Sequence, residues 1–72
     1  MTTATTLPVF VNGAPRELSA ESTVADLIDV LGLRRDLVAV ELNREIVRKV
    51  DFDSRKLQAG DRIEIVEFVG GG

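Results

Sequence analysis

One short apolar stripe with helical spacing, set among segments that alternate as strands do, constrains the fold most strongly. Its members recur at intervals of three and four residues, the period of one helix face. They are Val24, Leu27, Ile28 and Leu31. Thr23 and Asp26 have the spacing of a capping box at the start, and Gly32 is typical of a position just past a helix end. The sequence therefore predicts one main helix, which must cover whatever sheet the strands form.

Several segments alternate apolar and polar side chains, as half-buried strands do. They are Leu7–Val11, Arg16–Ser19, Leu37–Leu42, Glu45–Arg48 and Ile63–Val69. Asn12-Gly13 and Asn43-Arg44 predict tight turns, and Pro15 confines its strand to a sheet edge. One mixed sheet of about four to five strands, with the helix packed across it, buries all of these stripes most simply. The expected fold class is α+β, a β-grasp (ubiquitin-like) roll.

The last strand is expected to carry two different faces. Ile63 and Ile65 should point into the core, so Val66 and Phe68 fall on the opposite face. Phe10 alternates with Val9 and Val11, so it points away from the face that they share. If the first and last strands are neighbours, Phe10 widens the apolar patch formed by Val66 and Phe68. Two interpretations of Phe68 stay open: an anchor for a partner, or a cover over one end of the core.

Composition excludes whole classes of function. With 72 residues, 44% of them hydrophobic and 29% charged, the chain is expected to fold as one packed domain. It has no cysteine and no histidine, which rules out disulfides, thiolate metal sites and the Ser-His and Cys-His catalytic arrangements. We therefore expect no catalytic residue, and we predict that the protein is not an enzyme.

Charge and hydropathy narrow the partners. The net charge of −3 argues against nucleic acid. Basic residues occur in pairs with acidic residues nearby, which favours a solvated surface over a docking surface for a partner of opposite charge. The pairs are Arg34-Arg35, Arg48-Lys49 and Arg55-Lys56. No apolar stretch approaches the length of a membrane span, so we expect a cytoplasmic protein without membrane contact.

Asp51 and Asp53 are the one pair of acidic residues with the spacing of a small metal or paired-carboxylate site. They lie in a short connection without supporting ligands, which favours a role in a turn. The surrounding residues 51–57 are expected to form a short turn of helix. We therefore expect no metal site.

The chain ends in Gly70-Gly71-Gly72, directly after a strand. Glycine has no Cβ, so this tail can pass through gaps that exclude side chains, and three residues extend about 10 Å. The terminal carboxylate is ionised at neutral pH and can attack an activated phosphate. The alternative is an ordinary frayed terminus. We expect residues 1–6 to be a flexible leader, 7–69 the folded domain and 70–72 a flexible tail.

These residues resemble the sulfur-carrier proteins of thiamine biosynthesis, a branch of the ubiquitin-like family. The resemblance covers Leu7–Gly72 and is carried mainly by Val38–Val47 and Asp61–Gly72. The Asn43-x-Glu45-Ile46-Val47 element is more specific to the thiamine branch. The Gly-Gly ending is shared with the molybdopterin-synthase small subunit and with ubiquitin-like modifiers, so those functions stay as alternatives. A plain interaction module whose tail has no role is a further alternative.

The resemblance implies a function and a set of partners. An adenylyltransferase of the ubiquitin-activating type would use ATP and Mg²⁺ to adenylate Gly72, with Gly70 and Gly71 threading into its site. A cysteine desulfurase or another sulfur donor would then convert the adenylate into a thiocarboxylate. Thiazole synthase would accept that sulfur. Docking contacts would come from Val66, Phe68 and Val69, with Phe10 in the same patch, and the carrier itself would bind no cofactor.

Overall fold

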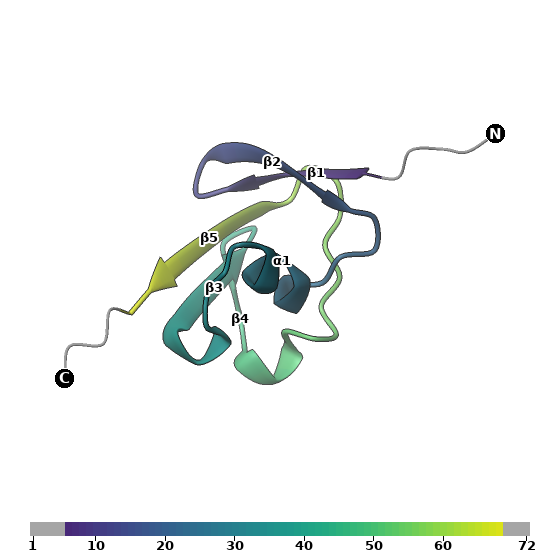
Figure 1. Ribbon diagram of the computed structural model, residues 1–72. Coiled ribbons are helices and arrows are strands. Elements are labelled where there is room, and N and C mark those ends of the chain that lie inside the picture. Colours follow the sequence, from purple (N-terminus) through teal and green to yellow (C-terminus); the bar gives the residue numbers. More distant parts are fainter. Residues whose placement is uncertain (1–5, 69–72) are drawn as a thin grey trace.

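The computed structural model describes residues 6–68, and these form one sheet with a single α-helix (Figure 1). The elements in chain order are β1 (Thr6–Val11), β2 (Ala14–Ser19), α1 (Val24–Val30), a 3-10 turn (Arg35–Leu37), β3 (Val38–Leu42), β4 (Glu45–Val47), a second 3-10 turn (Lys49–Asp51) and β5 (Arg62–Glu67). The sheet order is β2-β1-β5-β3-β4. β1 and β5 are parallel, and the other neighbours are antiparallel. The predicted β-grasp roll is confirmed.

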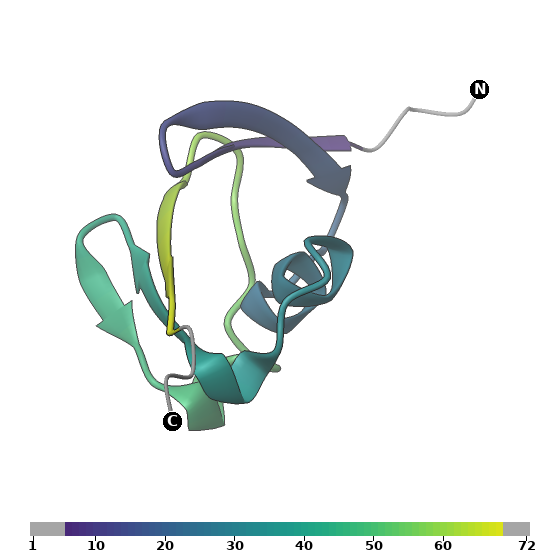
Figure 2. The ribbon, with the colours of Figure 1, turned by 60° about the vertical axis from the view of Figure 1, so that its left-hand side comes forward.

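The helix lies across one face of the sheet and leaves the other face uncovered by any described helix (Figures 1 and 2). The space between the helix and the sheet is filled by apolar side chains. They come from α1, from all five strands and from the long connection before β5. The buried set is Val9, Leu18, Val24, Ala25, Leu27, Ile28, Val38, Val40, Leu42, Val47, Phe52, Leu57, Ile63 and Ile65. The predicted inward positions of the strands are therefore confirmed.

Local signals at the helix ends act as the sequence predicts. The Thr23 Oγ1 accepts a hydrogen bond from the Asp26 N–H (3.1 Å), and the Asp26 carboxylate accepts one from the Thr23 N–H (2.9 Å). Leu31 is the half-buried residue that ends the helix. Gly32 follows at φ +73°, and its N–H donates to the Asp29 carbonyl (3.0 Å). The cap at each end satisfies backbone groups that a short helix would otherwise leave unpaired.

Both predicted hairpin turns are present. Asn12 and Gly13 have φ values of +49° and +85°, and Asn43 and Arg44 have φ values of +51° and +73°. Two consecutive residues in the left-handed region are the mark of a type I′ turn, whose twist matches that of the flanking strands. Pro15 lies in the edge strand β2, as predicted.

Several boundaries differ from the predictions. The strands after the first differ by one or two residues at an end: they are Ala14–Ser19, Val38–Leu42, Glu45–Val47 and Arg62–Glu67. Thr6, expected to end the leader, is the first residue of β1, because its position opposite Ser19 extends the antiparallel ladder by one pair. The helical turn expected over 51–57 lies earlier, at Lys49–Asp51. It ends there because the fully buried Phe52 enters the core, and its carbonyl accepts a hydrogen bond from the Ala25 N–H (2.9 Å). The rest of the leader, residues 1–5, lies outside the described residues.

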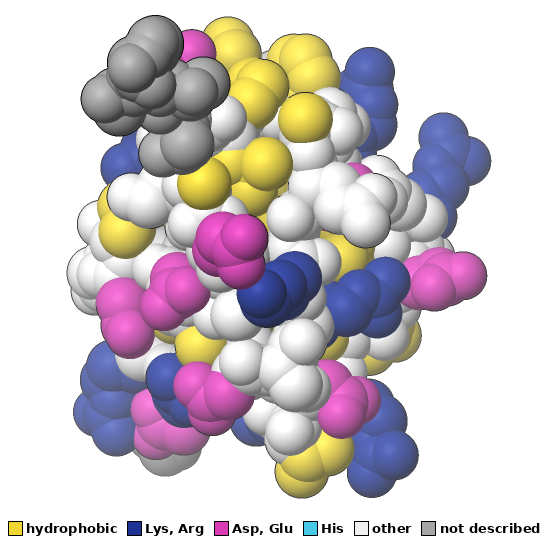
Figure 3. All heavy atoms as spheres, turned by 90° about the vertical axis from the view of Figure 1, so that its right-hand side faces the viewer, with side chains coloured by type: hydrophobic (Ala, Val, Ile, Leu, Met, Phe, Trp, Pro, Cys, Tyr) yellow, Lys and Arg dark blue, Asp and Glu magenta, His cyan; other side chains and the backbone are white. Residues whose placement is uncertain are grey.

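Charges of both signs are interspersed on the face of the molecule seen in Figure 3. The ion pairs within residues 6–68 join Arg34 to Asp36, Arg35 to Asp53 and Lys56 to Glu21, at 2.7–2.9 Å, and all are exposed. Exposed pairs of this kind add little to stability, as expected for a solvated surface. Among the described residues, no helix has the length and apolar character needed to cross a membrane.

Candidate functional site

The strand β5 lies at the centre of the sheet and leads directly to the C-terminal glycines. β1 flanks it on one side and β3 on the other. Its pairing extends beyond Glu67, because the Phe68 N–H donates to the Leu37 carbonyl (2.7 Å). Phe68 is thus a fixed starting point for the last residues of the chain. The predicted docking residue Val69, the predicted threading residues Gly70 and Gly71 and the predicted modification site Gly72 lie outside the described residues.

Val66 and Phe68 present apolar surface on the sheet face opposite α1. Their side chains are 58% and 52% exposed, whereas Ile63 and Ile65 on the same strand are buried. Val66 lies opposite the small side chain of Ala39 on β3, which leaves its flank open. The predicted division of β5 into a core face and an exposed apolar face is confirmed, and two predicted docking residues lie two positions apart on the exposed face.

Asn12 holds β5 at the point where β1 turns away from it. Its backbone N–H donates to the Ile63 carbonyl (2.8 Å). Its side-chain oxygen accepts from the Ile65 N–H (2.8 Å), and its side-chain nitrogen donates to the Ile65 carbonyl (3.3 Å). The amide thus continues the parallel ladder after the β1 backbone has left it. The sequence marks Asn12 only as a turn residue, so this second role was missed.

Asn43, the first residue of the other hairpin turn, makes equivalent contacts at the start of β5. Its side-chain oxygen accepts from the Arg62 N–H (2.9 Å), and its backbone N–H donates to the Arg62 carbonyl (2.8 Å). Its side-chain nitrogen donates to the Asp61 carboxylate (3.0 Å), which in turn accepts from the Gln58 N–H (2.7 Å). Two asparagines from two turns therefore fix the strand that carries the exposed apolar residues.

Phe10 lies apart from Val66 and Phe68. β1 and β5 are neighbours, but the register places Phe10 beside Arg62, four residues before Val66. The Arg62 guanidinium carbon lies 5.0 Å from the centre of the Phe10 ring, a cation–π contact. Glu64 lies between Arg62 and Val66 on the same face. The structure thus brings together Val66 and Phe68, and it places Phe10 at the charged start of β5.

Ile46 is an exposed apolar residue on this face that was not predicted as a site residue. It lies on β4 opposite Glu41 and is 76% exposed. A shallow hollow of about 300 Å³ runs between β4 and β5, and its lining residues are Ala39, Glu41, Ile46, Glu64 and Val66. The alternation of β4 could have indicated that Ile46 points outward, since Val47 beside it points into the core.

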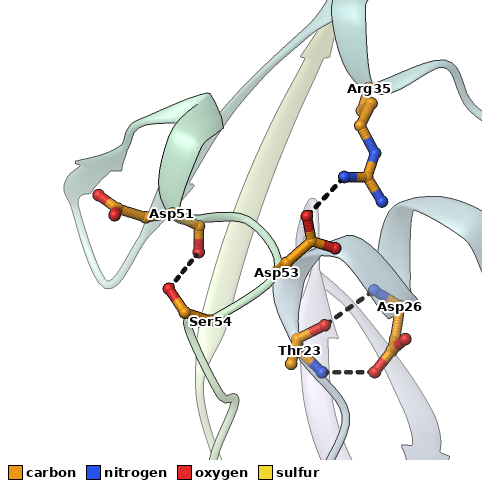
Figure 4. Close-up of polar contacts among 6 residues, drawn as sticks. All are labelled: Thr23, Asp26, Arg35, Asp51, Asp53 and Ser54. Carbon is orange, nitrogen blue, oxygen red and sulfur yellow. Dashed lines mark hydrogen bonds and ion pairs between the residues drawn. The ribbon is translucent and has the colours of Figure 1, made fainter.

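The Asp51-x-Asp53 segment forms a turn, as the sequence favours. In Figure 4 the Asp51 backbone carbonyl accepts a hydrogen bond from the Ser54 hydroxyl (3.3 Å), and the Asp53 carboxylate faces Arg35 from another part of the chain (2.9 Å). The bond to Asp53 raises the pKa of Arg35. Within residues 6–68 there is no group of three or more acidic side chains that could hold a metal ion.

The described residues form an exposed, partly apolar sheet face on the strand that precedes the C-terminal glycines in the sequence. The exposed apolar residues and the hollow lie on the face away from α1, and the strand that carries them leads to the C-terminal glycines. Exposed apolar residues grouped around a hollow mark surfaces that other molecules cover.

Comparison with known proteins gives a consistent result. The model of the ThiS family matches residues 9–72. The sulfur carrier protein ThiS of Thermus thermophilus is 34% identical over 64 residues, which cover 89% of this chain and 98% of that protein. The crystal structure of thiamine biosynthesis protein ThiS from Geobacter metallireducens superimposes with a TM-score of 0.78 at 32% identity, covering 92% of this chain and all of that one.

A longer relative is also similar. A thiazole synthase of Paramagnetospirillum magneticum is 42% identical over 66 residues, which cover 92% of this chain. This chain spans only 20% of that protein's length, so the similar segment is one part of a larger polypeptide. The family match over residues 9–72 and the ThiS structure with the same fold lead to one conclusion: the chain belongs to the ThiS family.

Proposed function

We propose that this protein is a sulfur carrier in thiamine biosynthesis and not an enzyme. The observation that carries the proposal is the family match, which extends to residue 72 and so includes the terminal glycines. The Thermus thermophilus relative, 98% of whose length aligns with this chain, is named a sulfur carrier protein. The absence of cysteine and histidine agrees with this role, because a carrier relies on its partners for catalysis.

In the proposed chemistry the Gly72 carboxylate is the reacting group. Its oxygen attacks the α-phosphate of ATP, pyrophosphate leaves, and an acyl-adenylate forms. An adenylyltransferase of the ubiquitin-activating type supplies the ATP and Mg²⁺ and stabilises the charge that develops on the phosphate. A sulfur nucleophile from a cysteine desulfurase or another donor then attacks the Gly72 carbonyl and displaces AMP. After reduction, where the donor is a persulfide, the product is a thiocarboxylate.

We propose thiazole synthase as the acceptor of this sulfur. The support is the Paramagnetospirillum magneticum thiazole synthase, which contains a segment 42% identical to this chain. A carrier-like segment within the same polypeptide indicates that the two activities work together. The alternatives are transfer to molybdopterin synthesis and conjugation to protein. No relative named above points to either.

Docking is proposed to use the exposed face of β5. Val66 and Phe68 lie four and two residues before Gly70 and are exposed in the folded chain. A partner that covers them holds the chain close to where the tail begins. Val69 would continue this contact. Phe10 is separated from Val66 by Arg62 and Glu64, so it would meet a different part of the partner.

The experiment that tests this function is an intact-mass measurement. The chain is incubated with ATP, Mg²⁺, its adenylyltransferase, a cysteine desulfurase, cysteine and a thiol reductant. We expect a mass gain equal to the replacement of one oxygen by sulfur, located at Gly72 by fragmentation. A chain that lacks Gly72 is the control and should stay unchanged. An unchanged wild-type mass, with the adenylyltransferase active on another carrier, would reject the proposal.

A further inference from the structure

We propose that the hollow between β4 and β5 receives an arginine or lysine side chain of thiazole synthase. The aliphatic stem of that side chain would lie on Ile46 and Val66, and its charged group would bind Glu41 and Glu64. This inference rests on the proposed function, since it takes thiazole synthase as the partner. It adds the type of side chain that thiazole synthase must present at this hollow.

The first observation is the apolar part of the hollow. Ile46 and Val66 are 76% and 58% exposed and line opposite sides of it, with β3 between them. On β3, Ala39 lies beside Val66 and Glu41 lies beside Ile46. Because Ile46 pairs with Glu41 and Val66 pairs with Ala39, the two apolar side chains lie diagonally across β3, two strand spacings of about 4.8 Å apart and two residues apart along the strand. The small Ala39 side chain leaves the part of the hollow beside Val66 open. A hollow of about 300 Å³ suits the methylene stem of one side chain better than it suits a helix or a strand.

The second observation is the pair of carboxylates that also line this hollow. Glu41 and Glu64 lie directly opposite each other on β3 and β5. Like charges in directly opposed positions destabilise a sheet. Neither residue takes part in the ion pairs found among residues 6–68. The nearby Arg62 guanidinium lies over the Phe10 ring on the β1 side. The two carboxylates therefore lie together on an exposed face, and neither forms an ion pair with a described residue.

The two observations together select an amphipathic cation. Lysine and arginine cover apolar surface with their stems while the charged head reaches a polar partner. A head placed between Glu41 and Glu64 would relieve their repulsion and form charge-assisted hydrogen bonds. A purely apolar side chain would leave both carboxylates unpaired at the contact, and an acidic one would add a third negative charge. Charge complementarity thus favours arginine or lysine over other occupants.

Thiazole synthase is the partner chosen because of the fused relative. In the Paramagnetospirillum magneticum protein a segment similar to this chain is part of the thiazole synthase polypeptide. The hollow also lies on the same face as Val66 and Phe68, so it continues the docking surface proposed above. One protein can therefore cover both areas while it holds the tail.

The test is the affinity of the full chain for separately purified thiazole synthase of the same source, measured by calorimetry at two salt concentrations. The variant is Glu41→Gln/Glu64→Gln. Its matched control is Glu17→Gln, an exposed acidic residue on β2, with β1 between it and β5. We expect the double variant to bind about tenfold more weakly, with a smaller salt dependence, and the control to bind as the wild type does. Ile46→Ser should also weaken binding.

Thermal unfolding of the same variants separates a docking role from a structural one. We expect the double variant to unfold at the wild-type temperature or slightly above it, because the repulsion between Glu41 and Glu64 is gone. A variant that binds weakly but unfolds at a lower temperature would overturn the inference, since the carboxylates would then support the fold.

Other outcomes also overturn it. Wild-type affinity in the double variant would show that the carboxylates meet no cation. Normal binding to thiazole synthase with slow sulfur uptake would assign the hollow to the adenylyltransferase instead. Failure of the proposed function itself looks different: the wild-type chain would gain no sulfur at Gly72 in the intact-mass experiment, whatever the variants do.

Discussion

The two ends of β5 differ in how they are held and in what they expose. At the start, the Asn43 side chain binds the Arg62 backbone and Arg62 packs over Phe10, and the Asn12 side chain binds the Ile65 backbone farther along the strand. At the end, Val66 and Phe68 keep more than half of their surface exposed. A strand held by backbone pairing and by two asparagine side chains can carry an exposed apolar surface without relying on that surface for stability.

The comparison also separates two physical roles on one strand, support of the fold and exposure of apolar surface. Residues at the start serve the fold, because a parallel pair as short as that of β1 and β5 leaves backbone groups that need partners. Residues at the end expose apolar surface, and covering such surface is favourable only when another molecule arrives. Substitutions at the start should therefore lower stability, and substitutions at the end should lower function.

The largest expected effect is on function and comes from the tail beyond β5. Gly71→Trp should reduce sulfur uptake at Gly72 by about 100-fold or more, since a bulky side chain prevents the carboxylate from reaching the reaction centre. The free energy of unfolding should stay within about 0.5 kcal/mol of wild type. Intact mass against time and urea unfolding measure the two quantities. Gly71→Ala is the smaller control, and wild-type uptake in Gly71→Trp would reject threading of the tail.

The next largest effect is on stability and comes from the side-chain hydrogen bonds that Asn12 makes to β5. Asn12→Ala removes both side-chain hydrogen bonds to Ile65 and places alanine at a positive φ, so we expect a loss of about 2–3 kcal/mol in the free energy of unfolding. Asn12→Asp keeps the acceptor and tolerates this conformation, so it should lose less. Urea unfolding measures both. A loss below about 0.5 kcal/mol for Asn12→Ala would contradict the role of Asn12 at β5.

The smallest effect concerns the difference between the two turns. Gly13 and Arg44 occupy equivalent turn positions with positive φ, but only glycine adopts that conformation without strain. Arg44→Gly should therefore stabilise the chain by about 0.5 kcal/mol, the relief of strain less the entropy that glycine adds to the unfolded state. Thermal unfolding detects such a change. A clear loss of stability would show that the Arg44 side chain contributes contacts that outweigh the strain.

Local signals explain what could be predicted from the sequence. The capping box at Thr23, the glycine after the helix and the two Asn-initiated turns act within a few residues, so their outcome depends little on the rest of the fold. The outward direction of Val66 and Phe68 followed from alternation with Ile63 and Ile65, because a strand has only two faces.

The rest depended on contacts between distant parts of the chain. The hydrogen bonds from Asn12 reach a residue 53 positions away, and nothing in the turn itself indicates them. Phe52 lies in an irregular segment without periodicity, so its complete burial was not apparent. The hollow beside Ile46 required the registers of β4 on β3 and of β3 on β5, which place Glu41 and Glu64 together.

The most direct test of the central claim is the rate of sulfur uptake at Gly72 in the variant Val66→Ser/Phe68→Ser, measured by intact mass beside its urea unfolding curve. Because both side chains are more than half exposed, stability should fall by less than about 1 kcal/mol. Sulfur uptake should be at least about tenfold slower, because the adenylyltransferase loses its apolar contact next to the tail. Wild-type uptake in a folded double variant would contradict the account.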